Sequence, residues 1–145
     1  MESRSNAYLL EDVMQGRFDY GFYQEELWTY VERRHQQARQ YRMDDVKHWV
    51  YSPCWSVECE GDEHFVSIYQ VLQQRAKFPL HIQRIEKADT QFPLIVIEDE
   101  FDKHGSILDG NHRFAKLVTH VVTSFSVHFI SRKELFTDSL LYRKL

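Results

Sequence analysis

The stretch 107–116, Ile-Leu-Asp-Gly-Asn-His-Arg-Phe-Ala-Lys, constrains the fold of this chain more than any other. Its apolar start stops at Asp109 and Gly110, and a helical pattern begins directly afterwards. Apolar residues then recur at positions 114, 117, 118 and 121, the spacing of one face of an amphipathic helix. The stretch therefore predicts a strand, a tight turn and the N-terminus of a helix.

The polar residues of this turn suit an anion. Asn111 is the expected N-cap, because its side-chain oxygen can accept a hydrogen bond from an amide of the first turn. Gly110 has no Cβ, so its backbone can adopt positive φ and approach a ligand closely. His112 and Arg113 would add donors at the helix end that already attracts negative charge. We therefore expect a site for phosphate or carboxylate oxygens.

A purely structural interpretation of the same residues remains open. Asp109 could accept hydrogen bonds from the turn, Asn111 could cap the helix, and Arg113 could pair with Asp109 or Glu98. The acidic loop 98–102 could supply a metal ligand, but a solvated hairpin tip is the favoured interpretation. Arg84 and Asp89 could line the same cleft or form a surface ion pair.

The segment 109–116 resembles the signature turn of the ParB/sulfiredoxin-like superfamily. It is most similar to short ParB-like proteins that read Asp-Gly-x-His-Arg-x-x-Lys, and to free serine kinases with Asp-Gly-His-His-Arg. The flanking segments 84–89 (Arg-Ile-Glu-Lys-Ala-Asp) and 92–96 (Phe-Pro-Leu-Ile-Val) resemble the helix and the proline-initiated strand of this family. The resemblance covers about residues 49–131.

The resemblance implies a nucleotide site. In the family, residues matching His112 and Arg113 lie at the phosphates of a nucleotide. The position matching Asp109 is linked with metal and catalysis in the serine kinases. ATP or another nucleotide and Mg²⁺ are therefore the expected cofactors. The candidate residues are Asp109 and His112 for catalysis, Asp109 for the metal, and Gly110, Asn111, His112, Arg113 and Arg84 for the nucleotide.

The sequence departs from each branch of the family. Sulfiredoxins have a reactive cysteine directly before His-Arg, and Asn111 stands there in this chain, so sulfinic-acid reduction is not expected. The Gly-Glu-Arg-Arg turn and helix-turn-helix of ParB itself are missing from the sequence. No glutamate can be matched to the catalytic glutamate of the serine kinases.

Composition narrows the class of protein. A length of 145 residues suggests one compact unit, and a net charge of −4 disfavours a protein that grips nucleic acid electrostatically. The N-terminus lacks the apolar segment of a signal peptide and no long apolar span follows, so we expect a cytoplasmic protein without membrane contact. Cys54, Cys59 and His64 lack the paired spacing and fourth ligand of a structural zinc site.

The order of expected elements gives an α+β fold, a small mixed sheet with flanking helices, ParB/sulfiredoxin-like, after an N-terminal helical extension over 1–45. The compact domain would span 46–145. Residues 48–55 suggest an edge strand or extended arm, and residues 65–72 slightly favour a strand leading into a short helix. The remaining expectations are helices over 6–15, 22–42, 81–87, 111–120 and 132–142, strands over 93–98, 106–108 and 124–130, and a polar hairpin loop over 99–105.

The leading hypothesis is a nucleotide- or phosphate-binding domain, with Mg-dependent phosphoryl transfer or nucleotide hydrolysis as its catalytic version. A protein-interaction or regulatory module that uses the N-terminal helices and the aromatic segment 49–55 is the alternative. A metal-dependent nuclease or DNA-binding protein is the weakest interpretation, because the chain is acidic. The other histidines, His81 among them, show no metal spacing and are expected to be structural or exposed.

Overall fold

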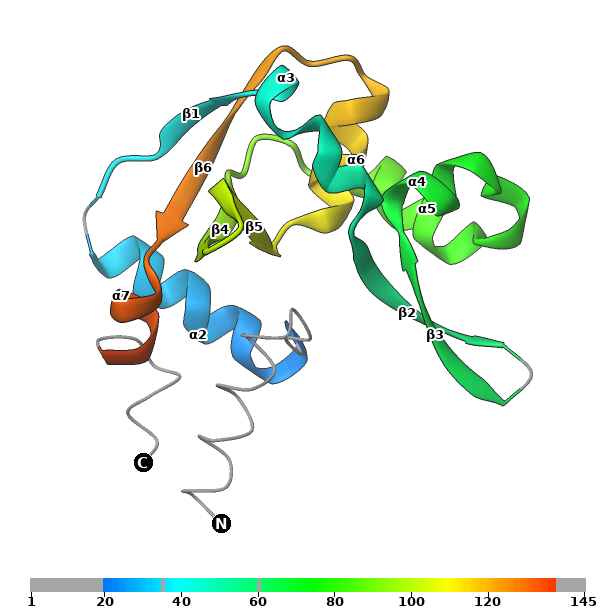
Figure 1. Ribbon diagram of the computed structural model, residues 1–145, viewed down its shortest axis with the longest axis horizontal. Helices are drawn as coiled ribbons and strands as arrows, with labels where there is room; N and C mark the ends of the chain where they lie inside the picture. Colours follow the sequence, from blue (N-terminus) through cyan, green and yellow to red (C-terminus); the bar gives the residue numbers. More distant parts are fainter. Residues whose placement is uncertain (1–19, 35, 60, 138–145) are drawn as a thin grey trace. The chain divides into compact units, whose positions relative to one another are not determined.

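A computed structural model of the chain describes residues 20–34, 36–59 and 61–137 (Figure 1). The helix predicted over 6–15 lies outside these residues, as does the end of the one predicted over 132–142. The chain forms two compact units. Unit 1 consists of Met1–Arg39, Ile95–Asp109 and Val127–Leu145, and unit 2 consists of Gln40–Leu94 and Gly110–Ser126. The predicted domain boundary near residue 45 stays a prediction.

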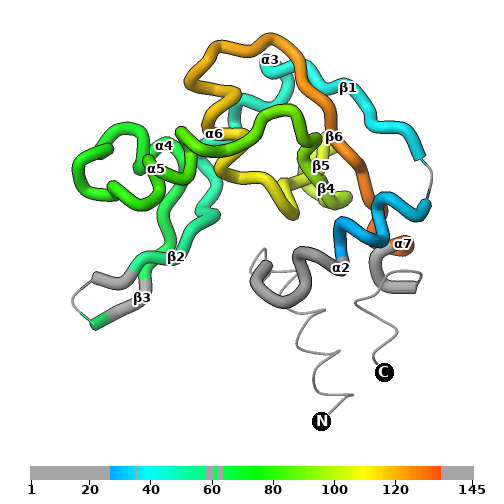
Figure 2. The backbone as a smooth tube through the Cα atoms, turned by 180° about the vertical axis from the view of Figure 1, so that it is seen from behind, coloured from blue at the N-terminus to red at the C-terminus, as the bar shows by residue number. Residues whose placement is uncertain are grey.

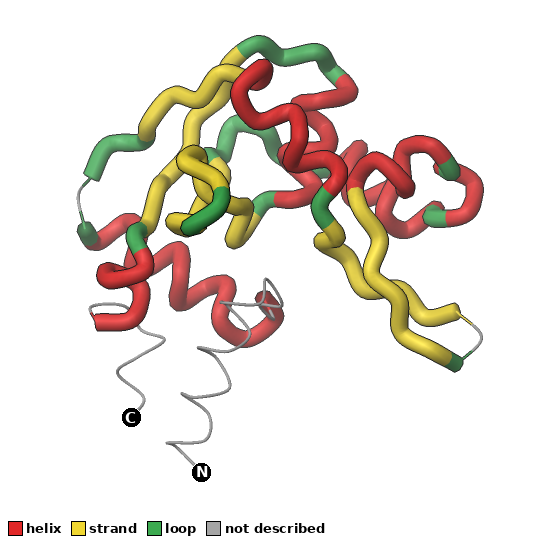
Figure 3. The backbone as a smooth tube through the Cα atoms, in the orientation of Figure 1, coloured by secondary structure: helices red, strands yellow, loops and turns green. Residues whose placement is uncertain are grey.

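Helices and strands alternate in a mixed α+β order (Figure 3). The strands form a four-stranded sheet in the order β1-β6-β4-β5 and a two-stranded sheet, β2-β3. The coarse prediction of a small sheet with flanking helices is therefore confirmed. The elements are α2 (Tyr20–Arg33), β1 (Arg39–Arg42), α3 (Met43–Val46), η1 (Lys47–Tyr51), β2 (Pro53–Cys59), β3 (Asp62–Ser67), α4 (Ile68–Gln73), η2 (Arg75–Lys77), α5 (Pro79–Lys87), β4 (Leu94–Asp99), β5 (Asp102–Asp109), α6 (Asn111–Thr119), β6 (Ser124–Ile130) and α7 (Arg132–Thr137).

In unit 1, the core forms where α2 meets the sheet. Its apolar side chains are Leu27, Val31, Ile95, Ile97, Leu108 and Ile130. The strand predicted over 93–98 is confirmed as β4, whose residues 94–97 are all buried as expected for a strand covered on both faces. Strand β5 pairs with it antiparallel, and the two lie side by side in Figure 2. Within the described parts of the chain, no helix has the length and apolar character needed to cross a membrane.

The hairpin between β4 and β5 is tighter than predicted. Only Glu100 and Phe101 form the turn, and β5 already begins at Asp102. The Asp99 carboxylate accepts a hydrogen bond of 2.8 Å from the Phe101 amide. Such a local bond between an aspartate and the amide two residues later stabilises a short turn. The polar composition of 99–105 therefore indicated a turn correctly, but exaggerated its length.

The helix predicted over 22–42 is wrong in its second half, because α2 ends at Arg33 and residues 39–42 form β1. The Arg34 guanidinium binds Glu134 at 2.6 Å and the Phe129 carbonyl at 2.7 Å, directly after the helix end. These contacts are made with residues about 100 positions away, which local helical periodicity does not reveal.

In unit 2, an aromatic cluster fills the core. The Trp49 ring lies 5.3 Å from that of Phe114, and Phe114 lies 5.8 Å from Phe125. Residues 62–73 form β3 followed by α4, as the sequence slightly favoured, with Ser67 and Gln70 making a capping box between them. The segment predicted as an edge strand over 48–55 differs, since residues 47–51 are a 3₁₀ helix and β2 begins at Pro53.

Helix α6 is confirmed over 111–119, with two corrections. Its N-cap is Gly110 and not Asn111, which is already the first helical residue. Val121, predicted on the buried face, is 83% exposed and has φ +54° because the helix has ended before it. The buried face consists of Phe114, Ala115 and Leu117.

Candidate functional site

Asp109 is the last residue of β5 and is buried in unit 1. Its Oδ2 atom accepts a hydrogen bond of 2.6 Å from the indole Nε1 of Trp28, on α2. A buried carboxylate needs donors of this kind, since an ionised group without them is costly to remove from water. The residue predicted as catalytic and metal-binding therefore has one oxygen engaged by an indole N–H group.

Gly110 begins the part of the turn that belongs to unit 2. Its φ of +116° is in the left-handed region that favours glycine, and it serves as the N-cap of α6. A Cβ atom there would lie 2.6 Å from Leu94 Cδ2 and 2.9 Å from Arg113 Nη2. The guanidinium of Arg113 is therefore folded back over Gly110, at the start of the helix.

The first turn of α6 combines helix amides with this cation. The first intrahelical bond, from the Phe114 amide to the Gly110 carbonyl, is 2.8 Å long, so the amides of Asn111, His112 and Arg113 precede it. Gly110 has no side chain that could cap them. Partial positive charge at a helix N-terminus and a nearby guanidinium both favour a negatively charged ligand.

His112 lies on an aromatic platform in unit 2. Its ring stacks on Trp55 with a centroid separation of 4.4 Å and an angle of 19°. The ring of His81, on α5, stacks on the same Trp55 at 4.6 Å and 18°. The two imidazoles are joined by a hydrogen bond of 3.1 Å between His81 Nδ1 and His112 Nε2.

This packing changes the charge state expected for His112. Burial lowers its pKa to about 4, with smaller contributions from His81 and from the positive charge of Arg84. Burial also lowers the pKa of His81, and Arg84 adds to the effect. At neutral pH both imidazoles are therefore uncharged in the ligand-free structure, and His112 would meet a ligand as a neutral hydrogen-bonding group.

Arg84 and Lys116 have different roles. Arg84 is exposed on α5, and its charge acts on both imidazoles, so unit 2 brings this predicted residue near His112. Lys116, the last residue of the motif, donates hydrogen bonds to the carbonyls of Glu86 and Ala88 at 2.8 and 2.9 Å. It satisfies carbonyl groups at the C-terminal end of α5 and thus joins α5 to α6.

The sequence did not predict His81 and Trp55 as part of this arrangement. His81 was expected to be structural or exposed, and Trp55 was assigned to an aromatic segment that could bind a protein partner. The one local signal is that His81 precedes Arg84 by a single helical turn on α5. Their meeting with His112 depends on the packing of α5 against α6 and on the position of β2.

The cysteine thiol and the possible metal ligands remain to be placed. Burial raises the pKa of the Cys54 thiol to about 12, so it stays protonated and unreactive at neutral pH. Over residues 20–34, 36–59 and 61–137, no three His, Cys, Asp or Glu side chains are grouped so that they could hold a metal ion.

Comparison of the chain with protein-family models, curated proteins and solved structures found no significant match.

Proposed function

We propose that this chain is a phosphate- or nucleotide-binding domain of ParB/sulfiredoxin-like fold with an N-terminal helical extension, and that phosphate oxygens bind at the first turn of α6. One observation carries the proposal: the Arg113 guanidinium is folded over Gly110, beside the amides that begin the helix. Convergent N–H groups and a planar, always charged guanidinium are the donors that phosphate oxygens prefer. The strand–turn–helix order predicted from the sequence supports the same site.

The proposal is for binding and not for phosphoryl transfer. Asp109, the expected base or metal ligand, is buried and accepts the Trp28 indole N–H. A neutral His112 supplies no positive charge for a transition state. Positioning of phosphate by α6 needs neither residue to change its protonation state.

Titration calorimetry with ATP, ADP and CTP, each with and without Mg²⁺, tests the proposal. We expect at least one nucleotide to bind, and Arg113→Lys to weaken binding by about tenfold because lysine cannot form two parallel hydrogen bonds. Arg75→Lys is the matched control, since Arg75 is an exposed arginine of unit 2 with only a 3.6 Å contact to Glu86. No binding of any nucleotide, or equal loss in both variants, would overturn the proposal.

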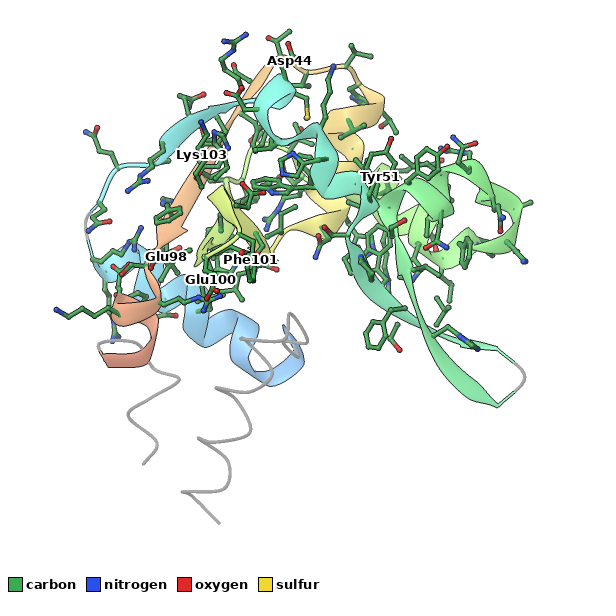
Figure 4. The ribbon with its side chains drawn as sticks, viewed as in Figure 1. Asp44, Tyr51, Glu98, Glu100, Phe101 and Lys103 are labelled. Atoms are coloured by element: carbon green, nitrogen blue, oxygen red, sulfur yellow. The ribbon has the colours of Figure 1, made fainter. Side chains whose placement is uncertain are left out.

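A protein-interaction module remains the second candidate function, and exposed aromatic side chains favour it. Tyr51, labelled in Figure 4, lies beside Tyr69. Tyr51 is 65% exposed and Tyr69 is 44% exposed, and their ring centroids are 5.1 Å apart. Trp49 and Trp55, whose exposure beside Tyr51 would have favoured this candidate further, are both buried. A Tyr51→Ser/Tyr69→Ser variant that still binds nucleotide would separate this surface from the α6 site.

A further inference from the structure

His81 and His112 form a pair with an unusual shared environment. Their ring centroids are 5.3 Å apart and their planes differ by 18°, while each ring lies within 4.6 Å of the Trp55 ring. Two rings on opposite faces of an indole would be separated by about twice the stacking distance. Both imidazoles therefore lie side by side on one face of Trp55, with His81 Nδ1 and His112 Nε2 facing each other at 3.1 Å.

Hydrogen-bond chemistry limits how many protons this pair can hold. One of the two facing nitrogens must carry a hydrogen and the other must accept it. The outer nitrogens, His81 Nε2 and His112 Nδ1, then share a single hydrogen when both rings are neutral. One added proton completes both outer N–H groups and leaves the inner bond intact. A second proton would place two N–H groups against each other, so the pair takes up one proton and not two.

The surroundings keep the pair neutral in the absence of a ligand. Arg84 on α5 is the charged group that acts on both rings. Strand β2 contributes the uncharged Trp55 ring and the Cys54 thiol, which stays protonated, and α4, which contacts α5, has no Asp, Glu, Lys, Arg or His residue. Helix α6 adds Arg113 and Lys116, which are both cationic. The charged group that acts on both rings is thus positive, and the Glu86 carboxylate, also on α5, is exposed and lies 3.6 Å from the Arg75 guanidinium. A bound anion would therefore bring to the pair a negative charge that opposes the effect of Arg84.

We propose that the His81–His112 pair takes up one proton when a phosphate group binds at the first turn of α6, so that anion affinity rises as the pH falls. This inference rests on the proposed function and adds a regulation to the same site. The proton goes to an outer imidazole nitrogen, where the anion's charge stabilises the resulting cation. His81 is then a positioning residue that completes the proton-accepting unit through His112.

Sulfate is the best first probe, because its charge does not change between pH 5 and 8 and any pH dependence must come from the protein. We expect sulfate affinity to fall by about tenfold for each pH unit as the pH rises from 5.5 to 7, the dependence expected when one proton is linked to binding. ADP should show the same dependence once its own phosphate ionisation is subtracted. If sulfate responds to pH and ADP does not, the site recognises a free tetrahedral anion and not a nucleotide.

The double variant His81→Gln/His112→Gln should bind sulfate with an affinity that no longer changes with pH. His128→Gln is the matched control, because His128 also has a lowered pKa but belongs to unit 1, and it should keep the full dependence. Unchanged pH dependence in the double variant would overturn the pairing proposal alone. No sulfate or nucleotide binding at any pH would instead overturn the proposed function, and this inference with it.

Histidine NMR on the ligand-free chain provides an independent readout. Between pH 8 and 4, resonances of His81 and His112 should shift together with a total uptake of one proton. In His81→Gln, which cannot share a proton in the same way, His112 should titrate alone at a different pH. Independent titration of both imidazoles near pH 6.5 in the unsubstituted chain would show that they do not act as one unit.

Discussion

Trp28 and Trp55 each contact one residue of the 109–113 turn, and they do so through different parts of the indole ring. In unit 1, Trp28 uses its N–H group to hold the buried carboxylate of Asp109. In unit 2, Trp55 uses its flat face to support two neutral imidazoles. The hydrogen bond from Trp28 is directional and polar, whereas stacking on Trp55 depends on the apolar surface area that the rings bury. The same residue type thus holds a carboxyl group by a hydrogen bond in unit 1 and keeps two basic groups uncharged by stacking in unit 2.

The largest expected loss of stability comes from removing the Trp55 ring, on which the two imidazoles stack. Trp55→Ala should lower the free energy of unfolding by about 3–5 kcal/mol, because a buried aromatic ring is lost and a cavity remains. The pKa of His112 should move up towards its ordinary value, since water would reach the ring. Chemical denaturation and histidine NMR measure the two effects. A stable variant with an unchanged His112 pKa would mean that Trp55 does not control the pair.

The substitution Trp→Phe separates the two kinds of contact. Trp28→Phe leaves the Asp109 carboxylate without its indole donor and should cost about 2 kcal/mol. Trp55→Phe keeps an aromatic face and should cost less, about 1 kcal/mol. Denaturant unfolding of both variants gives the comparison directly. Equal losses would show that the polar bond to Asp109 adds nothing beyond packing.

The turn itself should respond strongly to a methyl group. Gly110→Ala combines positive φ with contacts under 3.0 Å, and we expect a loss of about 2–3 kcal/mol. Gly61→Ala is the matched control, because Gly61 also has positive φ but nothing lies within 4 Å of its added Cβ. It should cost only about 1 kcal/mol. Similar losses of stability for the two variants in thermal unfolding would indicate that backbone strain alone, without crowding by Leu94 and Arg113, makes Gly110 sensitive to substitution.

Acidification should destabilise the chain through the paired imidazoles. Their folded-state pKa values lie below the unfolded value near 6.5, so protons bind the unfolded chain first and favour it. The contribution of the two imidazoles to the free energy of unfolding is then fully present above pH 6.5, and it decreases as the pH falls towards 4. Because solvent partly reaches both rings, we expect a loss of roughly 1 kcal/mol between pH 7 and 5. The loss should shrink in His81→Gln/His112→Gln, as measured by urea unfolding at each pH.

The smallest expected loss of stability comes from the contact between α5 and α6. Lys116→Met removes two hydrogen bonds to carbonyls of α5 and should cost about 1 kcal/mol. Lys103→Met, at an exposed position of β5, should be neutral within about 0.5 kcal/mol. Faster amide exchange at residues 85–88 in the Lys116 variant would locate the effect. Exchange that stays unchanged there would mean that other contacts hold the end of α5.

Local patterns predicted the strand, turn and helix around Gly110 because each depends on neighbours in sequence. The strand over 93–98 was predicted for the same reason. Patterns failed where distant contacts decided the structure. Arg34, directly after the end of α2, binds Glu134, and His81 meets His112 on the Trp55 ring. Asn111 was a good cap candidate, yet the left-handed backbone at position 110 suits only glycine well.

The half-buried thiol of Cys54 offers a way to follow the motions of unit 2. Cys54 lies on β2, one residue before Trp55, and an amide of Ile68 on α4 contributes a hydrogen bond to its sulfur. Alkylating reagents attack thiolates, and a thiol with a pKa of about 12 presents almost none at neutral pH. The rate of Cys54 alkylation would therefore report how often β2 opens. Measuring this rate with and without ligand would show whether ligand binding slows the separation of Trp55 from the two imidazoles.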